Sequence, residues 1–124
     1  MATPEIIKKQ SLRDRLIVIQ AVNYKKQGYT DIKVNQKNYL LGPPEKVGSY
    51  TPDLSAVLND KTTICDVETN DSINNAQTVE KWKEFDRSGY AFHLIIPNSA
   101  FDVVKEIAKS NGITVDKYWC SKNY

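Results

Sequence analysis

The chain has 124 residues and a formal net charge of +2, with 40% of its residues hydrophobic and 26% charged. These values suit one compact domain over residues 1–124 and exclude a disordered chain and a disulfide scaffold, and no apolar run approaches the ~18 residues of a membrane span. Two cysteines and one histidine exclude a Cys/His zinc site, and no signal peptide opens the chain, so we expect a cytoplasmic protein with reduced cysteines.

The first predicted element is a long helix that ends at Gly28. Thr3-Pro4-Glu5 is typical of a helix start, because it combines a hydroxyl cap, a proline in the first turn and an acid near the positive end. Apolar residues then recur at roughly helical spacing: Ile6, Ile7, Leu12, Leu16, Ile19, Val22 and Tyr24. The same segment is basic, with Lys8, Lys9, Arg13, Arg15, Lys25 and Lys26 against Glu5 and Asp14. A basic helix suits a protein that binds a polyanion, and it also suits an ordinary solvated surface.

Strand-like segments follow the helix, at residues 29–34, 39–41, 53–58 and 61–68. A loop rich in glycine and proline separates the second of these segments from the third. The last two are separated by Asn59-Asp60, a pair that tolerates the positive φ angles of a tight hairpin turn. With such a two-residue turn, Leu58 pairs with Lys61, and the register of the whole hairpin follows.

This hairpin brings three carboxylates onto one face of the predicted sheet. Asp53 lies directly opposite Asp66, and Glu68 projects from the same face two residues further on. The residues on the other face are predicted to belong to the hydrophobic core: Leu54, Ala56, Leu58, Cys65 and Val67. Like charges opposite each other destabilise a sheet, and a bound divalent cation would supply the missing positive charge. The alternative is a solvent-facing acidic strand end, although Val57 and Ile64 make this face partly apolar.

The last third of the chain alternates helices and strands. The predicted elements are a helix from a cap at Asp71 or Ser72 to about Arg87, a strand over 90–96, a helix from a capping box at Ser99–Asp102 to Gly112, and a strand over 113–119. The order αβββαβαβ predicts a single α/β domain with a central mixed β-sheet flanked by helices, in which the hairpin carries the acidic site. His93 alternates with Phe92 and Leu94, so we interpret it as a core or edge residue rather than a catalytic one.

The arrangement of these motifs resembles that of the PD-(D/E)xK nuclease superfamily, which includes many restriction enzymes and Holliday-junction resolvases. The resemblance is carried by Pro52-Asp53 on one strand and Asp66-Val67-Glu68 on the next, followed by a helix with Gln77 and Lys81. Each short motif is common by chance, and it is their placement on adjacent strands before a helix that makes the match credible. Because the order of elements from Thr3 to Trp119 matches the core of the family, the resemblance implies a restriction-endonuclease-like fold over nearly the whole chain.

The resemblance implies phosphodiester hydrolysis that depends on Mg²⁺, for which Mn²⁺ would substitute. Asp53 and Asp66 would be direct metal ligands, with the Val67 carbonyl as a third. Glu68 would orient the attacking water or bind a second metal ion. Gln77 would make a polar contact with the site or with a phosphate.

The sequence departs from the family at the third motif position, where the family usually has lysine and this chain has Glu68. The family contains active enzymes with Glu or Gln at this position and inactive members that only bind. One explanation is that the following helix, rather than the strand, supplies the lysine of the motif. Lys81 lies one helical turn after Gln77 and shares its face, so it would either reach the hairpin and stabilise the phosphate or be a solvated helix lysine.

We therefore expect a metal-dependent nuclease that acts on DNA and holds the nucleic-acid backbone with its basic first helix. A homodimer is expected, because cutting two strands with one site usually requires two copies, and a helicase or another subunit is a further candidate partner. One alternative is a catalytically inactive nucleic-acid-binding or assembly module on the same fold, which need not bind a divalent ion. Another is an interaction protein whose acids are surface residues. No membrane partner is expected.

Overall fold

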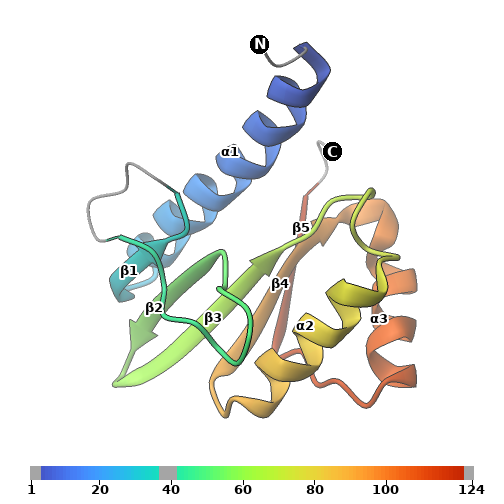
Figure 1. The fold of residues 1–124 in the computed structure, drawn as a ribbon. Coiled ribbons are helices and arrows are strands. Elements are labelled where there is room, and N and C mark those ends of the chain that lie inside the picture. Colours follow the sequence, from blue (N-terminus) through green and yellow to red (C-terminus); the bar gives the residue numbers. More distant parts are fainter. Residues whose placement is uncertain (1–3, 37–41, 122–124) are drawn as a thin grey trace.

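A long N-terminal helix and a five-stranded sheet form the frame of the molecule (Figure 1). The computed structural model describes the backbone of residues 4–36 and 42–121 and the side chains of residues 12–36 and 42–120. The elements in chain order are α1 (Pro4–Lys26), β1 (Thr30–Val34), β2 (Leu54–Leu58), β3 (Lys61–Val67), α2 (Ala76–Arg87), β4 (Ala91–Pro97), the short 3₁₀ helix η1 (Asn98–Ala100), α3 (Phe101–Ser110) and β5 (Lys117–Ser121). The strand predicted over 39–41 lies outside the described residues.

The sheet is mixed and has the strand order β1-β2-β3-β4-β5. The pairs β1–β2 and β2–β3 are antiparallel, whereas β3–β4 and β4–β5 are parallel. This division follows from the connections, because a tight turn can join antiparallel strands and parallel strands need a crossover. Here α2 and α3 are the two crossovers. The prediction of a single α/β domain with a central mixed sheet is confirmed.

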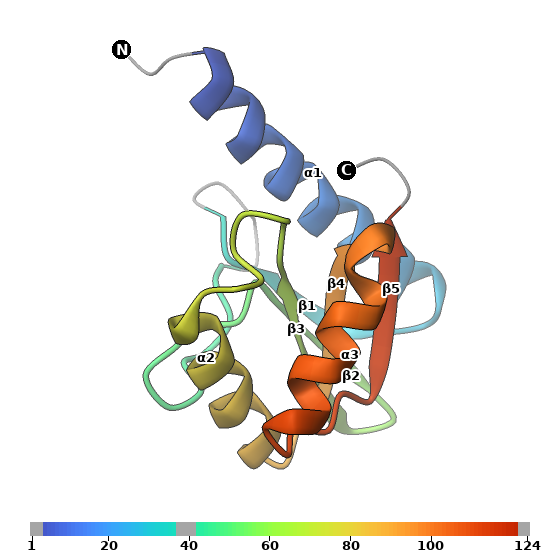
Figure 2. The same ribbon diagram turned by 90° about the vertical axis from the view of Figure 1, so that its right-hand side faces the viewer.

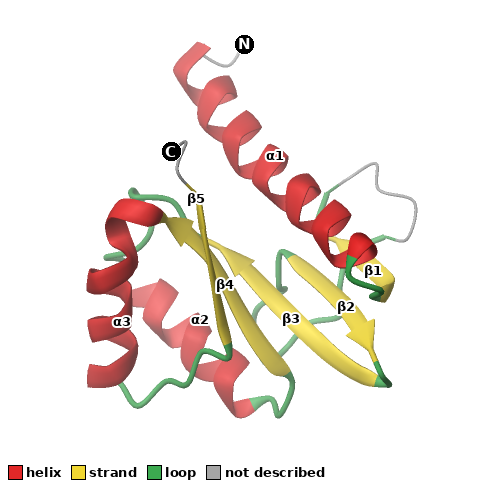
Figure 3. Ribbon diagram, turned by 180° about the vertical axis from the view of Figure 1, so that it is seen from behind, coloured by secondary structure: helices red, strands yellow, loops and turns green. Residues whose placement is uncertain are grey.

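Helices cover both faces of the sheet (Figures 2 and 3). Helix α1 packs on one face, and α2 and α3 pack on the other. The core on the α1 side contains Leu16, Ile17, Ala21, Tyr24, Ile32, Val34, Leu54, Ala56, Cys65, Val67 and Ile95. The core on the opposite side contains Val47, Ile64, Ile73, Trp82, Phe85, Phe92, Leu94, Ile96, Ala100, Val104, Ala108 and Ile113. In the described part of the chain, no helix is long and apolar enough to span a bilayer.

The β2–β3 hairpin has the predicted turn and register. Asn59 and Asp60 have φ angles of 52° and 64°, the left-handed values of a type I′ turn. The pairing continues from the turn to Leu54, which lies opposite Cys65, and the N–H of Asp53 donates to the Cys65 carbonyl at 3.1 Å. The register therefore brings Asp53 next to the acidic end of β3.

The buried face of α1 differs from the predicted one. Leu16, Ile17 and Tyr24 point into the core, whereas Ile19 and Val22 are 54% and 47% exposed. The helix carries apolar residues on two sides, and only one side can be buried against a single sheet. The predicted list of apolar positions did not separate the two sides.

Two of the predicted helix starts are wrong. The cap of α2 is Asn75, whose side chain accepts from a backbone N–H of the first turn at 2.8 Å. Ser72 instead closes a separate turn through hydrogen bonds to Thr69, so the helix begins later than expected. The capping box predicted at Ser99 does not form, because η1 precedes α3 and the cap residue, Ala100, has no polar side chain.

Candidate active site

Three carboxylates lie buried where β2 begins and β3 ends. Asp53 immediately precedes β2, Asp66 belongs to β3 and Glu68 follows it, and their exposed fractions are 3%, 1% and 1%. Two of the alternatives are therefore wrong: the acids are not a solvent-facing strand end, and they are not surface residues of an interaction protein. Acids that are buried together require positive partners, because an unpaired buried carboxylate is costly.

Helix α2 supplies one positive partner, Lys81. Its Nζ lies 2.8 Å from Glu68 Oε2 and 3.1 Å from Asp66 Oδ1, and 17% of its side chain is exposed. The next residue, Trp82, donates from Nε1 to Asp66 Oδ2 at 3.0 Å. The interpretation of Lys81 as a solvated helix lysine is therefore wrong.

Helix α1 supplies the other positive partner, Arg13, which the sequence indicated only as part of a basic helix. Arg13 Nη2 donates to Asp53 Oδ1 at 2.6 Å, and the N–H of Val67 donates to Asp53 Oδ2 at 2.7 Å. Helical spacing holds a signal for this placement. Arg13 precedes the buried Leu16 and Ile17 by three and four residues, so all three lie on the face of α1 that packs on the sheet.

Burial and mutual repulsion raise the proton affinity of both aspartates. Burial, followed by the charge of Asp66, raises the pKa of Asp53 from 3.8 to about 7. Burial, followed by the charge of Glu68, raises the pKa of Asp66 from 3.8 to about 7. At neutral pH the two aspartates are therefore partly protonated, and bound protons neutralise the acid that exceeds the two cations, Arg13 and Lys81.

Glu68 and Lys81 form the ionised pair of the cluster. Burial acts to raise the pKa of Glu68, but interactions with Asp66 and Lys81 outweigh it, and the pKa falls below its ordinary 4.5. Burial acts to lower the pKa of Lys81, but the charges of Asp66 and Glu68 outweigh it and raise the pKa. At neutral pH, Lys81 is therefore an ammonium group and Glu68 a carboxylate.

The cluster has the donor chemistry of a magnesium site. Mg²⁺ takes oxygen ligands, uses one or two protein carboxylates and keeps several waters, so two carboxylates such as those of Asp53 and Asp66 would be enough to hold it. No group of three or more His, Cys, Asp or Glu side chains in the described ranges is arranged to hold a metal ion. Both oxygens of each aspartate already face a protein donor. The donor set fits Mg²⁺ on condition that the cation takes the place of one of these donors.

The remaining predicted residues, Val67 and Gln77, lie beside the cluster in different ways. The N–H of Val67 holds Asp53, and its side chain belongs to the core on the α1 side. Gln77 is exposed in the first turn of α2, where it lines a cavity of about 240 Å³ together with Tyr50, Thr78 and Lys81. The structure thus brings the three acids and Lys81 together and leaves Gln77 at an adjoining cavity.

His93 is a core residue, as predicted. Its Nδ1 lies 2.7 Å from the hydroxyl of Tyr24 and 3.4 Å from Nε1 of Trp119. Burial, followed by the charge of Lys117, lowers the pKa of His93 from 6.5 to about 4. The ring is therefore neutral at pH 7 and belongs to an aromatic cluster between α1 and β5.

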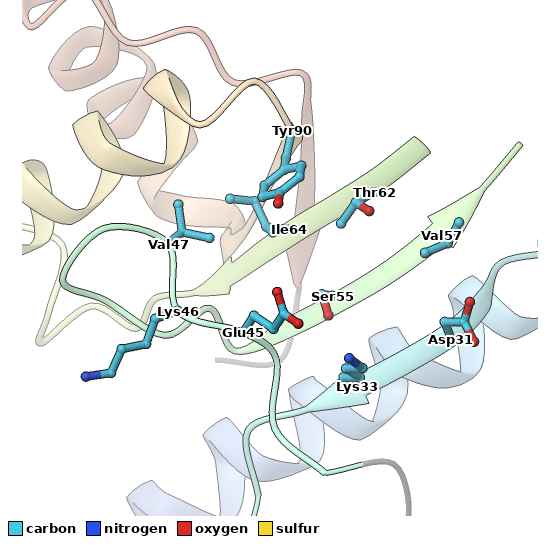
Figure 4. Close-up of a pocket in the computed structure, with 10 residues that line it drawn as sticks. All are labelled: Asp31, Lys33, Glu45, Lys46, Val47, Ser55, Val57, Thr62, Ile64 and Tyr90. Atoms are coloured by element: carbon cyan, nitrogen blue, oxygen red, sulfur yellow. The ribbon is translucent and has the colours of Figure 1, made fainter. Parts of the chain in front are cut away.

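A second cavity, of about 290 Å³, lies over β1, β2 and β3 (Figure 4). The loop before β2 forms its other wall. Its charged lining residues are two acids and two lysines: Asp31, Lys33, Glu45 and Lys46. None of the predicted site residues lines this cavity, so it is separate from the acidic cluster.

Comparison of the chain with protein-family models, with curated proteins and with solved structures found no match. Function is therefore inferred from the chemistry of the cluster itself. That chemistry consists of three buried carboxylates, a fixed ammonium group and a guanidinium group at one end of a hairpin.

Proposed function

We propose that the protein is a metal-dependent nuclease that hydrolyses phosphodiester bonds, with DNA as its substrate. One observation carries the proposal. Three buried carboxylates share two cationic side chains, which leaves one acid in excess for a proton or a divalent cation to neutralise. Burying like charges lowers stability, and proteins retain such arrangements mainly at functional sites.

In this proposal each member of the cluster has a role. Asp53 and Asp66 would hold Mg²⁺ or Mn²⁺, together with the Val67 carbonyl. A cation held there would supply an activated water and neutralise charge on the phosphate. Glu68 orients the attacking water as a carboxylate, and the ammonium group of Lys81 stabilises the charge that develops on the phosphate.

The resemblance to the PD-(D/E)xK superfamily supports the proposal. The observed element order, αβββαβαβ, agrees with the order that the resemblance implies, and we propose the restriction-endonuclease-like topology on this basis. Lys81 brings an amino group to within 2.8 Å of Glu68, the residue at the position where the family usually has lysine. Gln77, at the adjoining cavity, is proposed to contact a neighbouring phosphate.

We propose that the basic residues of α1 hold the DNA backbone, in a manner that depends on salt but not on sequence. A homodimer would present two sites, one for each strand of a duplex. A helicase or another subunit would be the partner if the protein acts on one strand as part of a larger assembly.

The second candidate is a catalytically inactive nucleic-acid-binding or assembly module on the same fold. The observation that favours it is that both oxygens of Asp53 and of Asp66 already face protein donors, so the cluster holds together without a metal ion. This candidate predicts DNA binding that is sensitive to salt and indifferent to chelators.

Cleavage of supercoiled plasmid and of branched DNA in Mg²⁺, in Mn²⁺ and in chelator distinguishes the two candidates. We expect cleavage that requires the cation and is lost in Asp53→Asn, Glu68→Gln and Lys81→Met. Glu80→Gln and Lys83→Met are the matched controls. They change the same charges in a pair on the outer side of α2, and they should leave cleavage intact.

Each outcome decides between the candidates. Binding without cleavage, unchanged by Asp53→Asn, supports the inactive module. Cleavage that survives Asp53→Asn contradicts the proposed metal site. Cleavage that is lost in Lys81→Met but kept in Glu68→Gln retains the nuclease and assigns the role of the family's lysine to Lys81 alone.

A further inference from the structure

The two oxygens of Asp53 have different kinds of partner. Oδ2 accepts from the N–H of Val67, a backbone group of β3 that cannot move away without opening the sheet. Oδ1 accepts from Nη2 of Arg13, a side chain that comes from a different layer of the fold. A cation held by Asp53 would therefore take Oδ1 and compete directly with the guanidinium.

Of the two cationic side chains in the cluster, Arg13 is the easier to release. Its side chain is 37% exposed, whereas that of Lys81 is 17% exposed. Lys81 pairs with two carboxylates, and Arg13 donates one hydrogen bond, to Asp53. The guanidinium can therefore turn towards solvent with the loss of one hydrogen bond, while Lys81 stays on the remaining acids.

Arg13 lies on α1 one turn before Leu16 and Ile17, which are on the same face and are buried against the sheet. The N-terminal part of α1 extends past the end of the sheet (Figures 1 and 3). The guanidinium contacts the acidic cluster through Asp53, and 37% of the Arg13 side chain is exposed, so it is accessible to solvent as well. Its planar fork of N–H donors matches a phosphate and stays charged at any working pH.

We propose that Arg13 exchanges its partner when the site is loaded. In the metal-free protein the guanidinium neutralises Asp53. Once a divalent cation occupies the oxygens of Asp53 and Asp66, the guanidinium binds a phosphate of the nucleic-acid backbone. This exchange presupposes the proposed nuclease site. The cation repels the guanidinium from Asp53, and the phosphate offers it a new anionic partner, so one side chain couples the binding of the cation to the binding of nucleic acid.

The test measures two affinities in Arg13→Gln and in the matched control Arg87→Gln. Arg87 is exposed in the last turn of α2, so its substitution removes the same charge without touching the cluster or the basic residues of α1. Titration of Mn²⁺ in the absence of DNA, followed by electron paramagnetic resonance, should show severalfold tighter binding in Arg13→Gln than in wild type, because a competing cation is gone. Arg87→Gln should bind Mn²⁺ as wild type does.

The second affinity is that for a short DNA duplex, measured with Ca²⁺ and again with chelator. With Ca²⁺, Arg13→Gln should bind the duplex about tenfold more weakly than Arg87→Gln, the loss expected for a charged hydrogen bond. With chelator, the two variants should bind equally. Opposite shifts in the two affinities distinguish an exchange of partners from a structural role, which would weaken both. Thermal unfolding establishes that each variant folds.

The outcomes separate this inference from the proposed function. If wild type binds no Mn²⁺, or if Asp53→Asn leaves Mn²⁺ affinity unchanged, the nuclease site itself is overturned. If Mn²⁺ binds through Asp53 but Arg13→Gln matches Arg87→Gln in both measurements, only the exchange is overturned. Weaker Mn²⁺ binding in Arg13→Gln also overturns it, since Arg13 would then only support Asp53. If Arg13→Gln does not fold, Arg13→Lys keeps the charge without the fork and should still lose DNA affinity in Ca²⁺.

Discussion

Lys81 pairs with two buried carboxylates at once, so its removal tests the cluster more directly than any other single change. Lys81→Met leaves Asp66 and Glu68 buried without their ammonium partner. We expect the free energy of unfolding to fall by about 3 kcal/mol in metal-free buffer, as is typical when one partner of a buried ion pair is removed. Urea unfolding at neutral pH measures this loss. Lys83→Met, which breaks an outer pair with Glu80, should cost less than about 0.5 kcal/mol. Equal losses in both variants would contradict the pairing.

The raised pKa values of the two aspartates make stability depend on pH. An acid whose pKa is higher in the folded than in the unfolded protein binds protons more tightly when folded, so the free energy of unfolding falls as the pH rises between the two values. For Asp53 and Asp66 these values are 3.8 and about 7. His93, with a pKa lowered from 6.5 to about 4, acts in the opposite sense over much of this range. Glu68, with a lowered pKa, acts in the same sense as His93, but only below 4.5.

The difference in free energy of unfolding between wild type and Asp53→Asn isolates the contribution of the aspartates. His93 is present in both proteins, so its contribution cancels. The stability of wild type relative to the variant should fall steadily from about pH 4 to about pH 7 and level off above it. Urea unfolding at constant ionic strength and in chelator gives this difference at each pH. A difference that rises with pH over this range would mean that Asp53 has a lowered pKa in the folded protein.

The β2–β3 hairpin fixes the register of the cluster, and its turn is not optimal. Asp60 has a φ of 64°, a value that glycine adopts without strain and that other residues adopt at a cost. We expect Asp60→Gly to raise the free energy of unfolding by about 0.5 kcal/mol, since Asn-Gly is the preferred pair of this turn. Thermal unfolding measures it. Asp102→Gly, in the first turn of α3, should instead lower stability by about 1 kcal/mol, because glycine loses more backbone freedom on folding and the substitution removes an acid from the positive end of the helix. A loss in Asp60→Gly would show that the Asp60 side chain contributes to the turn.

Local rules explain which parts of the site could be predicted. The hairpin turn and the alternation of side chains along a strand depend on a few neighbouring residues, so the meeting of Asp53 with the acids of β3 followed from the sequence. Helical spacing placed Lys81 on a candidate face of α2, and packing decided that this face meets the hairpin. Arg13 was missed for the same reason that Ile19 and Val22 were misplaced. Helix α1 has apolar residues on two sides, and only its contact with the sheet selects one of them.

The cluster joins all three layers of the fold, because Arg13 comes from α1, the acids from the strands and Lys81 from α2. A cation bound there should therefore stabilise the whole domain. At 100 times its dissociation constant, a ligand that binds only the folded state adds ~2.7 kcal/mol, which raises the melting temperature by several degrees. Thermal unfolding in Mg²⁺ or Mn²⁺ and in chelator measures this shift, and Asp53→Asn should abolish it. A shift of the same size in the variant would place the cation elsewhere, and no shift in wild type would favour the inactive module.

The partners in the cluster come from unequal distances along the chain. Lys81 and Trp82 lie 13 and 16 residues from their acids, whereas Arg13 lies 40 residues from Asp53. Closing a longer loop costs more entropy and slows folding, so the hairpin and α2 can form their half of the cluster before α1 docks. During synthesis, however, α1 is made before the strands. Its apolar face therefore stays exposed until the strands that bury it have been synthesised. If α1 docks last, the contact between Arg13 and Asp53 is the last of the cluster to form, and a chain at that stage of folding has an acidic site without its guanidinium partner.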